Sequence, residues 1–228
     1  MGKYLLLALI SLQILLSSCK NQHPSIAAIN SGTITFNINY LCSEKDNPMI
    51  SLLPTRMQVK FKNDNISLST EGYLGLFSTR FISQATSPNS HFLLKVLNNK
   101  LDYQFPRHEL AFIYEDTKEM KIEYSDSTKN IAGYSCNMAK VYLKKSPQTP
   151  ITIFYTKEIQ LKDPNRNTPF YQLKGVLLEF RVRMYGIDTH IQATEIKEGP
   201  IDDSEFIVPQ DYKKVTRQEI QKFILDFT

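Results

Sequence analysis

The sequence has 228 residues with a formal net charge of +4 at pH 7, and 42% of its residues are apolar. An apolar fraction of this size is typical of a chain that buries a core. The small charge, without a clustered basic stripe, excludes the usual electrostatic footprint of a nucleic-acid-binding protein.

The N-terminus has the pattern of a secretory signal. Lys3 gives a positive start, and an apolar run from Tyr4 to Leu16 follows. The run is shorter than the roughly 20 apolar residues of a membrane-spanning helix, so we expect residues 1–18 to be removed. The break Leu16-Ser17-Ser18-Cys19 resembles the lipobox of bacterial lipoproteins, in which the cysteine thiol receives a diacylglyceryl group. We therefore predict lipidation of Cys19; the alternative is a plain secretory signal with a cysteine nearby.

Residues 19–30 are polar or small and show no period, which predicts a flexible, lipid-anchored tether. Lys20, rather than an aspartate, follows Cys19, so the inner-membrane retention signal of some bacteria is absent. This favours the outer membrane of a bacterial envelope as the location. Removing the signal leaves about 210 residues, which we expect to form a single domain over residues 31–228.

Two cysteines remain besides Cys19. In an oxidising periplasm Cys42 and Cys136 could form a disulfide that closes a long loop, worth about 4 kcal/mol on the chain-entropy model. The alternative is two buried free thiols. Neither cysteine lies in a recognisable motif with a histidine, which disfavours a catalytic thiol.

Most of the chain after the tether is predicted to be strand. Thr33–Cys42 alternates strictly between apolar and polar residues, as a half-buried strand does. The same pattern recurs along the chain, with turn residues between the segments. The further expected strands are Arg56–Lys62, Ile66–Phe81 with a break near Gly72 and Gly75, Phe92–Leu97, Leu101–Phe105, Met120–Tyr124, Tyr134–Leu143, Ile151–Thr156, Val176–Met184 and Asp188–Ile196.

The chain ends in a predicted amphipathic helix over residues 216–227. Thr216 and Glu219 form a capping box, and Ile220, Phe223, Ile224 and Phe227 fall on one face. We expect this face to dock on the sheet; the alternative is a helix that binds a partner or a membrane surface.

Five segments share their order and spacing with a known family: Ser31–Phe36, Lys129–Ala139, Ile153–Ile159, Leu173–Glu179 and Ala193–Lys213. They resemble the motifs of Bacteroidetes lipoproteins of unknown function with a GLPGLI-like domain, including K-x-I-x-G-Y-x-C-x-x-A over Lys129–Ala139. Phe154 replaces the usual tryptophan, and Lys174 replaces the proline of the namesake motif. The resemblance implies a fold similar to LolA and LolB, a strongly curved, open antiparallel sheet with helices on its concave side. It implies no catalytic residues.

Metal and cofactor motifs are missing from the sequence, and no cofactor is expected. The acidic group Asp202, Asp203 and Glu205 and the segment Lys162–Pro169, with Asp163, Asn165 and Asn167, lack the spacing of a calcium loop, so we expect solvated loops at both places. Gly133-Tyr134-x-Cys136 is expected to serve the core rather than a site. Asp126-Ser127-Thr128 resembles the short O-glycosylation site of exported Bacteroidetes proteins.

These features predict a mainly β, non-enzymatic envelope lipoprotein that reaches its membrane through the lipid anchor. In the first hypothesis the curved sheet encloses a hydrophobic ligand such as an acyl chain. The expected cavity lining is Phe36, Phe61, Leu94, Tyr142, Phe154 and Leu178. In the second, the protein is a structural or interaction lipoprotein that holds an envelope protein partner and no small molecule.

Overall fold

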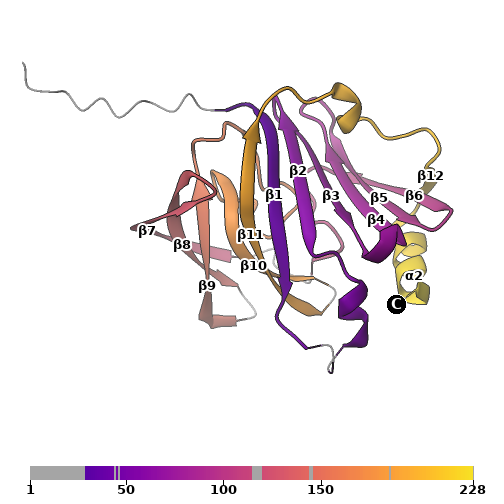
Figure 1. The fold of residues 1–228 in the computed structure, drawn as a ribbon, viewed down its shortest axis with the longest axis horizontal. Helices are drawn as coiled ribbons and strands as arrows, with labels where there is room; N and C mark the ends of the chain where they lie inside the picture. The colour runs from indigo at the N-terminus through magenta and orange to yellow at the C-terminus, as the bar shows by residue number, and fades with distance from the viewer. Residues whose placement is uncertain are drawn as a thin grey trace, which may run out of the picture.

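The computed structural model describes residues 29–227, without 44, 46, 115–119, 144–145 and 185. Within these residues twelve strands form one sheet, in the order β12-β6-β5-β4-β3-β2-β1-β11-β10-β9-β8-β7. All neighbours are antiparallel except the short pair of β12 and β6 (Figure 1). The sheet is large, curved and unclosed, and a C-terminal helix packs on it, which confirms the predicted fold class.

The strands of the sheet follow one another mainly by hairpins. Those of the N-terminal half are β1 (Ser31–Tyr40), β2 (Arg56–Lys62), β3 (Asn65–Glu71), β4 (Phe77–Ser83), β5 (Asn89–Val96) and β6 (Asn99–Pro106). Those of the C-terminal half are β7 (Met120–Ile131), β8 (Tyr134–Leu143), β9 (Ser146–Thr156), β10 (Val176–Met184), β11 (Ile187–Glu198) and β12 (Lys213–Val215). Short 3-10 turns are η1 (Pro48–Leu52), η2 (Tyr73–Gly75) and η3 (Asp203–Phe206), and the helix is α2 (Arg217–Phe227).

Tight turns set the register of two hairpins. Asn63 and Asp64 join β2 to β3 with φ of 49° and 66°, a left-handed conformation that asparagine and aspartate tolerate. Ala132 and Gly133 join β7 to β8 with φ of 51° and 90°. A Cβ on Gly133 would meet nothing within 4 Å, so the glycine serves backbone conformation rather than close packing.

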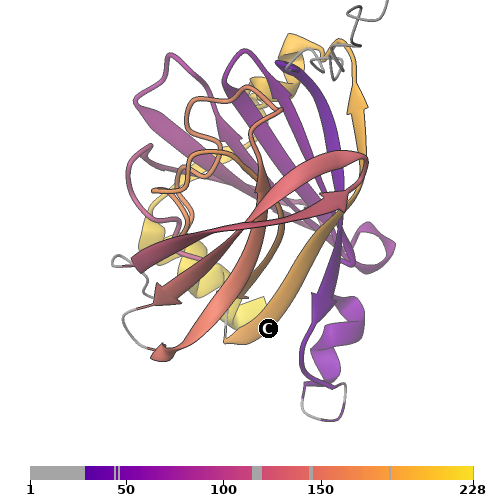
Figure 2. The same ribbon diagram turned by 90° about the vertical axis from the view of Figure 1, so that its left-hand side faces the viewer.

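The inner face of the curved sheet carries the core. Because side chains alternate along a strand, Ile34, Phe36 and Ile38 of β1 all point to this face and are buried. Figures 1 and 2 show β7–β9 bending round to face β1–β6 across the interior. The larger hydrophobic cluster joins β1, β2 and β8–β11, and the smaller one lies under α2 against β5 and β6.

Helix α2 begins with the predicted capping box. The backbone N–H of Thr216 donates to Glu219 Oε2 at 2.6 Å, and the N–H of Glu219 donates to Thr216 Oγ1 at 3.3 Å. Ile220 is fully buried in the smaller cluster, with Phe223 and Ile224 packed against it. The helix therefore docks on the sheet as expected; the side chain of Phe227 lies outside the described residues.

The segment between β9 and β10 differs from the expected solvated loop. Asn165, Arg166 and Asn167 are each at most 6% exposed. Asn165 Nδ2 donates to the carbonyls of Leu173 and Gly175, both at 2.9 Å. The amide of Asn165 therefore bonds to the protein backbone instead of to the water that the sequence pattern predicted. The expectation of solvation was wrong for Asn165 and Asn167, because their amides bond to the backbone of this connection and of the loop after β6, whereas Asp163 is exposed as expected.

Ile29 ties the start of the described chain to the sheet. It forms a parallel bridge with Ile159, its N–H donates to Glu158 O at 3.1 Å, and its side chain is 2% exposed. The signal over residues 1–18, Cys19 and most of the tether lie outside the described residues. Among the residues described, no helix has the length and apolar character needed to cross a bilayer.

Candidate functional site

The structure divides the six residues expected to line an apolar cavity between two hydrophobic clusters and the surface. Phe36, Phe61 and Leu178 are at most 2% exposed in the larger cluster, and Leu94 is buried in the smaller one near α2. Tyr142 is half-buried, and its hydroxyl donates to Glu123 at 2.9 Å. Phe154 is half-buried too, with the Lys129 ammonium 5.0 Å from its ring centre. Phe36, Phe61, Leu178 and Phe154 thus share the larger cluster, whereas Leu94 and Tyr142 lie apart from it.

Side chains from the β9–β10 connection fill the inner face. Phe170 is 2% exposed and meets Phe180 of β10 edge to face, with ring centres 5.7 Å apart. Leu173, 1% exposed, joins the same cluster. Under α2, Phe112 meets Phe92 at 5.2 Å. Aromatic contacts at these distances are typical of a packed core rather than of an open cavity.

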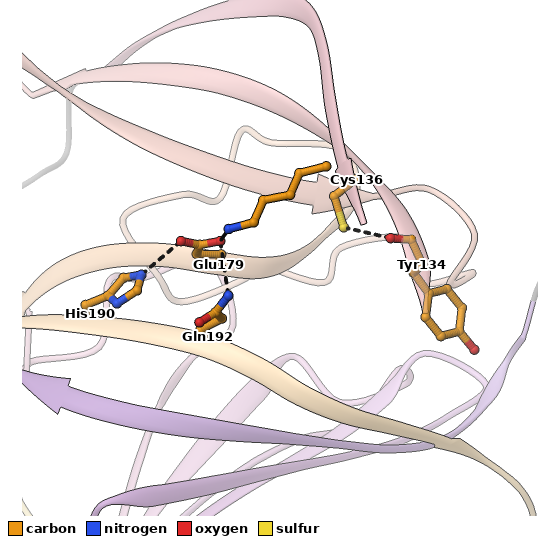
Figure 3. Close-up of polar contacts among 6 residues, drawn as sticks. Tyr134, Cys136, Glu179, His190 and Gln192 are labelled. Carbon is orange, nitrogen blue, oxygen red and sulfur yellow. Dashed lines mark hydrogen bonds and ion pairs between the residues drawn. The ribbon is translucent and has the colours of Figure 1, made fainter. Parts of the chain in front are cut away.

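Both cysteines of the fold are free thiols, with Cys136 buried and Cys42 half-buried. Burial, followed by the charge of Glu158, raises the pKa of the Cys136 thiol to about 11. The thiol donates to Tyr134 O at 3.5 Å, as Figure 3 shows. A neutral, buried thiol is a poor nucleophile, so Cys136 acts as a core residue, as the Gly133-Tyr134-x-Cys136 pattern predicted.

A polar network beside Cys136 ties β7 to β10 and β11. Glu179 accepts from His190 Nε2 at 3.1 Å and from Gln192 at 3.5 Å (Figure 3). Lys129 reaches the same carboxylate at 2.5 Å. His190 bonds to Glu179 rather than to the Cys136 thiol, so His190 and Cys136 do not form a nucleophile–base pair. The network is a structural clamp between strands.

The chain between β11 and β12 crosses the outer face of the sheet; we call residues 199–212 the strap. Glu205 lies between Lys60 of β2 and Arg80 of β4, at 2.6 Å and 3.0 Å. Asp203 pairs with Lys62 at 2.7 Å, and Gln84 donates to Phe206 O at 2.9 Å. The acidic group expected in a solvated loop therefore holds the strap on the sheet. The prediction missed this because its partners lie more than 100 residues away in sequence.

A groove lies between the strap and the η2 turn, over the outer face of β1–β6. Its volume is about 940 Å³, within the usual range for ligand pockets. Its floor includes one residue from each strand: Thr35, Gln58, Ser69, Arg80, Lys95 and Lys100. Leu74 forms part of one wall, and Pro209, Asp211 and Tyr212 form the other.

Cations outnumber carboxylates on the groove lining. Arg56, Arg80, Lys95 and Lys100 contribute four positive charges, and Glu71 and Asp211 two negative ones. Lys100 bonds to Asp211, and this hydrogen bond lowers the pKa of the Asp211 carboxyl. The groove is therefore a positively charged, solvent-exposed recess, the electrostatic character expected of an anion-binding surface.

Three other features of the described residues were candidates for a functional site: a metal-binding cluster, the segment Asp126–Thr128 and the buried Arg166. No group of three or more histidine, cysteine or acidic residues in the described part of the chain is arranged to hold a metal ion. Asp126, Ser127 and Thr128 are exposed in β7, where its register with β8 shifts. Arg166 is buried, and desolvation lowers its pKa to about 10. Its contact with the Asp64 carbonyl ties two loops together.

Sequence reasoning missed the groove. The alternation of Arg56, Gln58, Lys60 and Lys62 did place these side chains on the outer face of β2. Polar alternation alone is the ordinary mark of a solvated face, because any half-buried strand shows it. Only the strap converts that face into a recess, and its path depends on ion pairs between distant residues.

No protein-family model and no curated protein matches this sequence. Among solved structures, the chain is similar to PNGF-II, with 12% identity and a TM-score of 0.48 over 86% of this chain, which spans about a third (32%) of the length of PNGF-II. It is also similar to LprF from Mycobacterium bovis, with 11% identity and a TM-score of 0.31 over 83% of this chain and 92% of LprF. At these values the likenesses give no information on function, and the resemblance to the GLPGLI-like group rests on its motifs alone.

Proposed function

We propose that the protein is a non-enzymatic lipoprotein of a bacterial envelope, anchored through Cys19, that binds a partner in the groove under its strap. The observation that carries this proposal is the pairing of a filled inner face with a recessed, charged outer face. Ligands bind where a surface is concave and polar groups converge. On this chain those conditions meet over β1–β6 rather than inside the curve.

The anchoring half of the proposal is supported by the lipobox-like segment Leu16–Cys19. Mass spectrometry of the mature protein tests it directly, with a diacylglyceryl-modified Cys19 as the expected N-terminus. Cys19→Ser should release the protein from the membrane fraction. An unmodified mature N-terminus elsewhere in the chain would overturn the anchor.

The binding half is tested by photo-crosslinking in the native cells. A photoreactive residue at Gln58 lies on the groove floor, and the same residue at Arg181 lies exposed on β10, away from the groove. We expect a discrete adduct from position 58 that is absent from position 181. Equal adducts from both positions, or none from either, would contradict binding in the groove.

Binding of an acyl chain inside the curved sheet is the alternative. It requires that side chains packed on the inner face move away. Phe170, Leu173 and Ile220 would have to leave the inner face, because they occupy the space that a chain would fill. Native mass spectrometry of the protein extracted from its envelope separates the two proposals. A stoichiometric lipid beyond the covalent anchor would favour the acyl-chain alternative.

A further inference from the structure

Two lysines face one another on the floor of the groove. Lys95 of β5 and Lys100 of β6 are directly opposite partners in the antiparallel register, so their side chains leave the same face side by side. Like charges directly opposite one another destabilise a sheet unless an anion lies between them. Hairpin geometry does not require this pair, because any polar residues would suit an outer face.

The strap supplies a single carboxylate to this pair. Asp211 bonds to Lys100, while Lys95 has no hydrogen-bond or ion-pair partner among the described residues. Arg80 shares the single carboxylate of Glu205 with Lys60, at 3.0 Å and 2.6 Å. Arg56, at the other end of the groove, has no such partner in the described chain either. The groove therefore holds two cations, Lys95 and Arg56, that form no ion pair within the described residues, although Asp211 interacts with Lys95 through its charge and Glu71 also lines the groove.

The rest of the floor offers hydroxyl and amide groups. Ser69 of β3 lies between the cationic ends, and Thr35 of β1 and Gln58 of β2 lie at the end that holds Arg56. The strands β1–β5 are paired on both sides, so their backbone groups are already used and a peptide cannot add as a further strand there. Recognition must use side chains alone. Arg56 on β2 and Lys100 on β6 are four strands apart, or about 19 Å at the usual strand spacing.

We propose that the groove binds an acidic polysaccharide, with Lys95 and Lys100 holding one carboxylate group and Asp211 acting as the internal competitor for that position. An extended acidic glycan presents hydroxyl groups and repeated anionic groups along its length, which matches hydroxyls and amides among separated cations. The proposal deepens the proposed function, since it specifies the ligand of the same groove.

Isothermal titration calorimetry tests the proposal on the mature lipidated protein in phosphatidylcholine nanodiscs, which carry no net charge. The probes are oligogalacturonate, neutral dextran, poly-glutamate and inorganic phosphate at low salt. We expect oligogalacturonate to bind and dextran not to. K95Q and K100Q should each weaken binding about three- to fivefold, and binding should weaken further at high salt because exposed charges are screened.

Asp211→Asn should instead tighten oligogalacturonate binding about three- to fivefold, because it frees Lys100 for the ligand. Asp203→Asn is the matched control, since it removes the same charge from the strap at an ion pair with Lys62, outside the groove. Lys140→Gln, an exposed lysine on β8, controls for net charge. Equal gains in D203N and D211N, or losses in K140Q like those in K95Q, would contradict the assigned roles.

Two further outcomes overturn the ligand class. Tighter binding of poly-glutamate than of oligogalacturonate would assign the groove to an acidic peptide, and binding of phosphate alone would assign it to a single small anion. Absence of binding by every probe, in wild type and D211N alike, also refutes the proposal. A crosslink at position 58 in cells together with such an absence would leave the groove as a binding site and reject only the glycan.

Discussion

Replacing Phe170 by alanine tests whether the inner face of the sheet is a packed core. The ring is 2% exposed and contacts Phe180 at 5.7 Å between ring centres. Removing a buried phenylalanine side chain loses its transfer free energy and leaves a cavity, which together cost about 3–5 kcal/mol. For a domain of this size such a loss lowers Tm by about 6–20 °C.

Urea unfolding followed by circular dichroism gives the free energy of unfolding for the wild type and for F170A. Tyr171→Ala is the control, because Tyr171 is the next residue in the chain and is 48% exposed. We expect the control to lose less than about 1 kcal/mol. A similarly small loss in F170A would refute the packed core, because it would mean that the ring covers a cavity and can move aside. That result would favour the acyl-chain alternative.

Three further predictions concern single residues. Asn167→Ala should cost about 2–4 kcal/mol in urea unfolding, because Asn167 Nδ2 donates to Pro106 O at 3.1 Å and the residue has a φ of 61°; a loss below about 1 kcal/mol would contradict a structural role. Thr216→Ala should cost about 1 kcal/mol, with Thr216→Ser close to wild type in the same assay, since serine keeps the cap; equal losses would refute the capping box. The pKa of Cys136 is raised from 9.0 to about 11, so its contribution to stability is complete below pH 9 and is lost as pH rises towards 11. Unfolding free energies should therefore fall less steeply between those pH values in Cys136→Ala than in wild type, and parallel slopes would contradict the raised pKa.

The sequence predicts the local elements well because they depend on neighbouring residues. Alternation in Arg56–Lys62 and the pattern from Thr216 to Glu219 identify a strand and a helix start within a few residues. The turn after β5 shows the limit: Leu97 belongs to the expected strand Phe92–Leu97, yet in the structure it has a φ of 51°, a left-handed conformation that leucine rarely adopts. Pairing with β6 decides that register, not the preference of a residue for turns.

Burial of polar residues and the site are harder to predict, for a physical reason. The segment 162–169 has the composition of a solvated loop, yet Asn165 and Asn167 are buried because their amides bond to loops that fold beside them. The groove depends in the same way on Glu205, whose partners Lys60 and Arg80 lie over a hundred residues away. Composition shows which hydrogen bonds and ion pairs a side chain can form. Only the fold determines whether a partner for them lies within reach.

With the proposed lipid anchor at Cys19, the bridge between Ile29 and Ile159 would limit the distance between the groove and the membrane. With the proposed anchor at Cys19, ten residue steps lead to Ile29, and an extended chain covers at most about 35 Å over that length. β1 then runs about 33 Å from this end of the sheet. The register places Ser31 opposite Lys62 and Asn37 opposite Arg56. The groove wall at η2 therefore lies at the end of the sheet that is far from the tether. An anchored protein of this geometry would hold its sheet close to the membrane through a short tether. The groove would then lie far enough out to contact long polymers beyond the lipid headgroups.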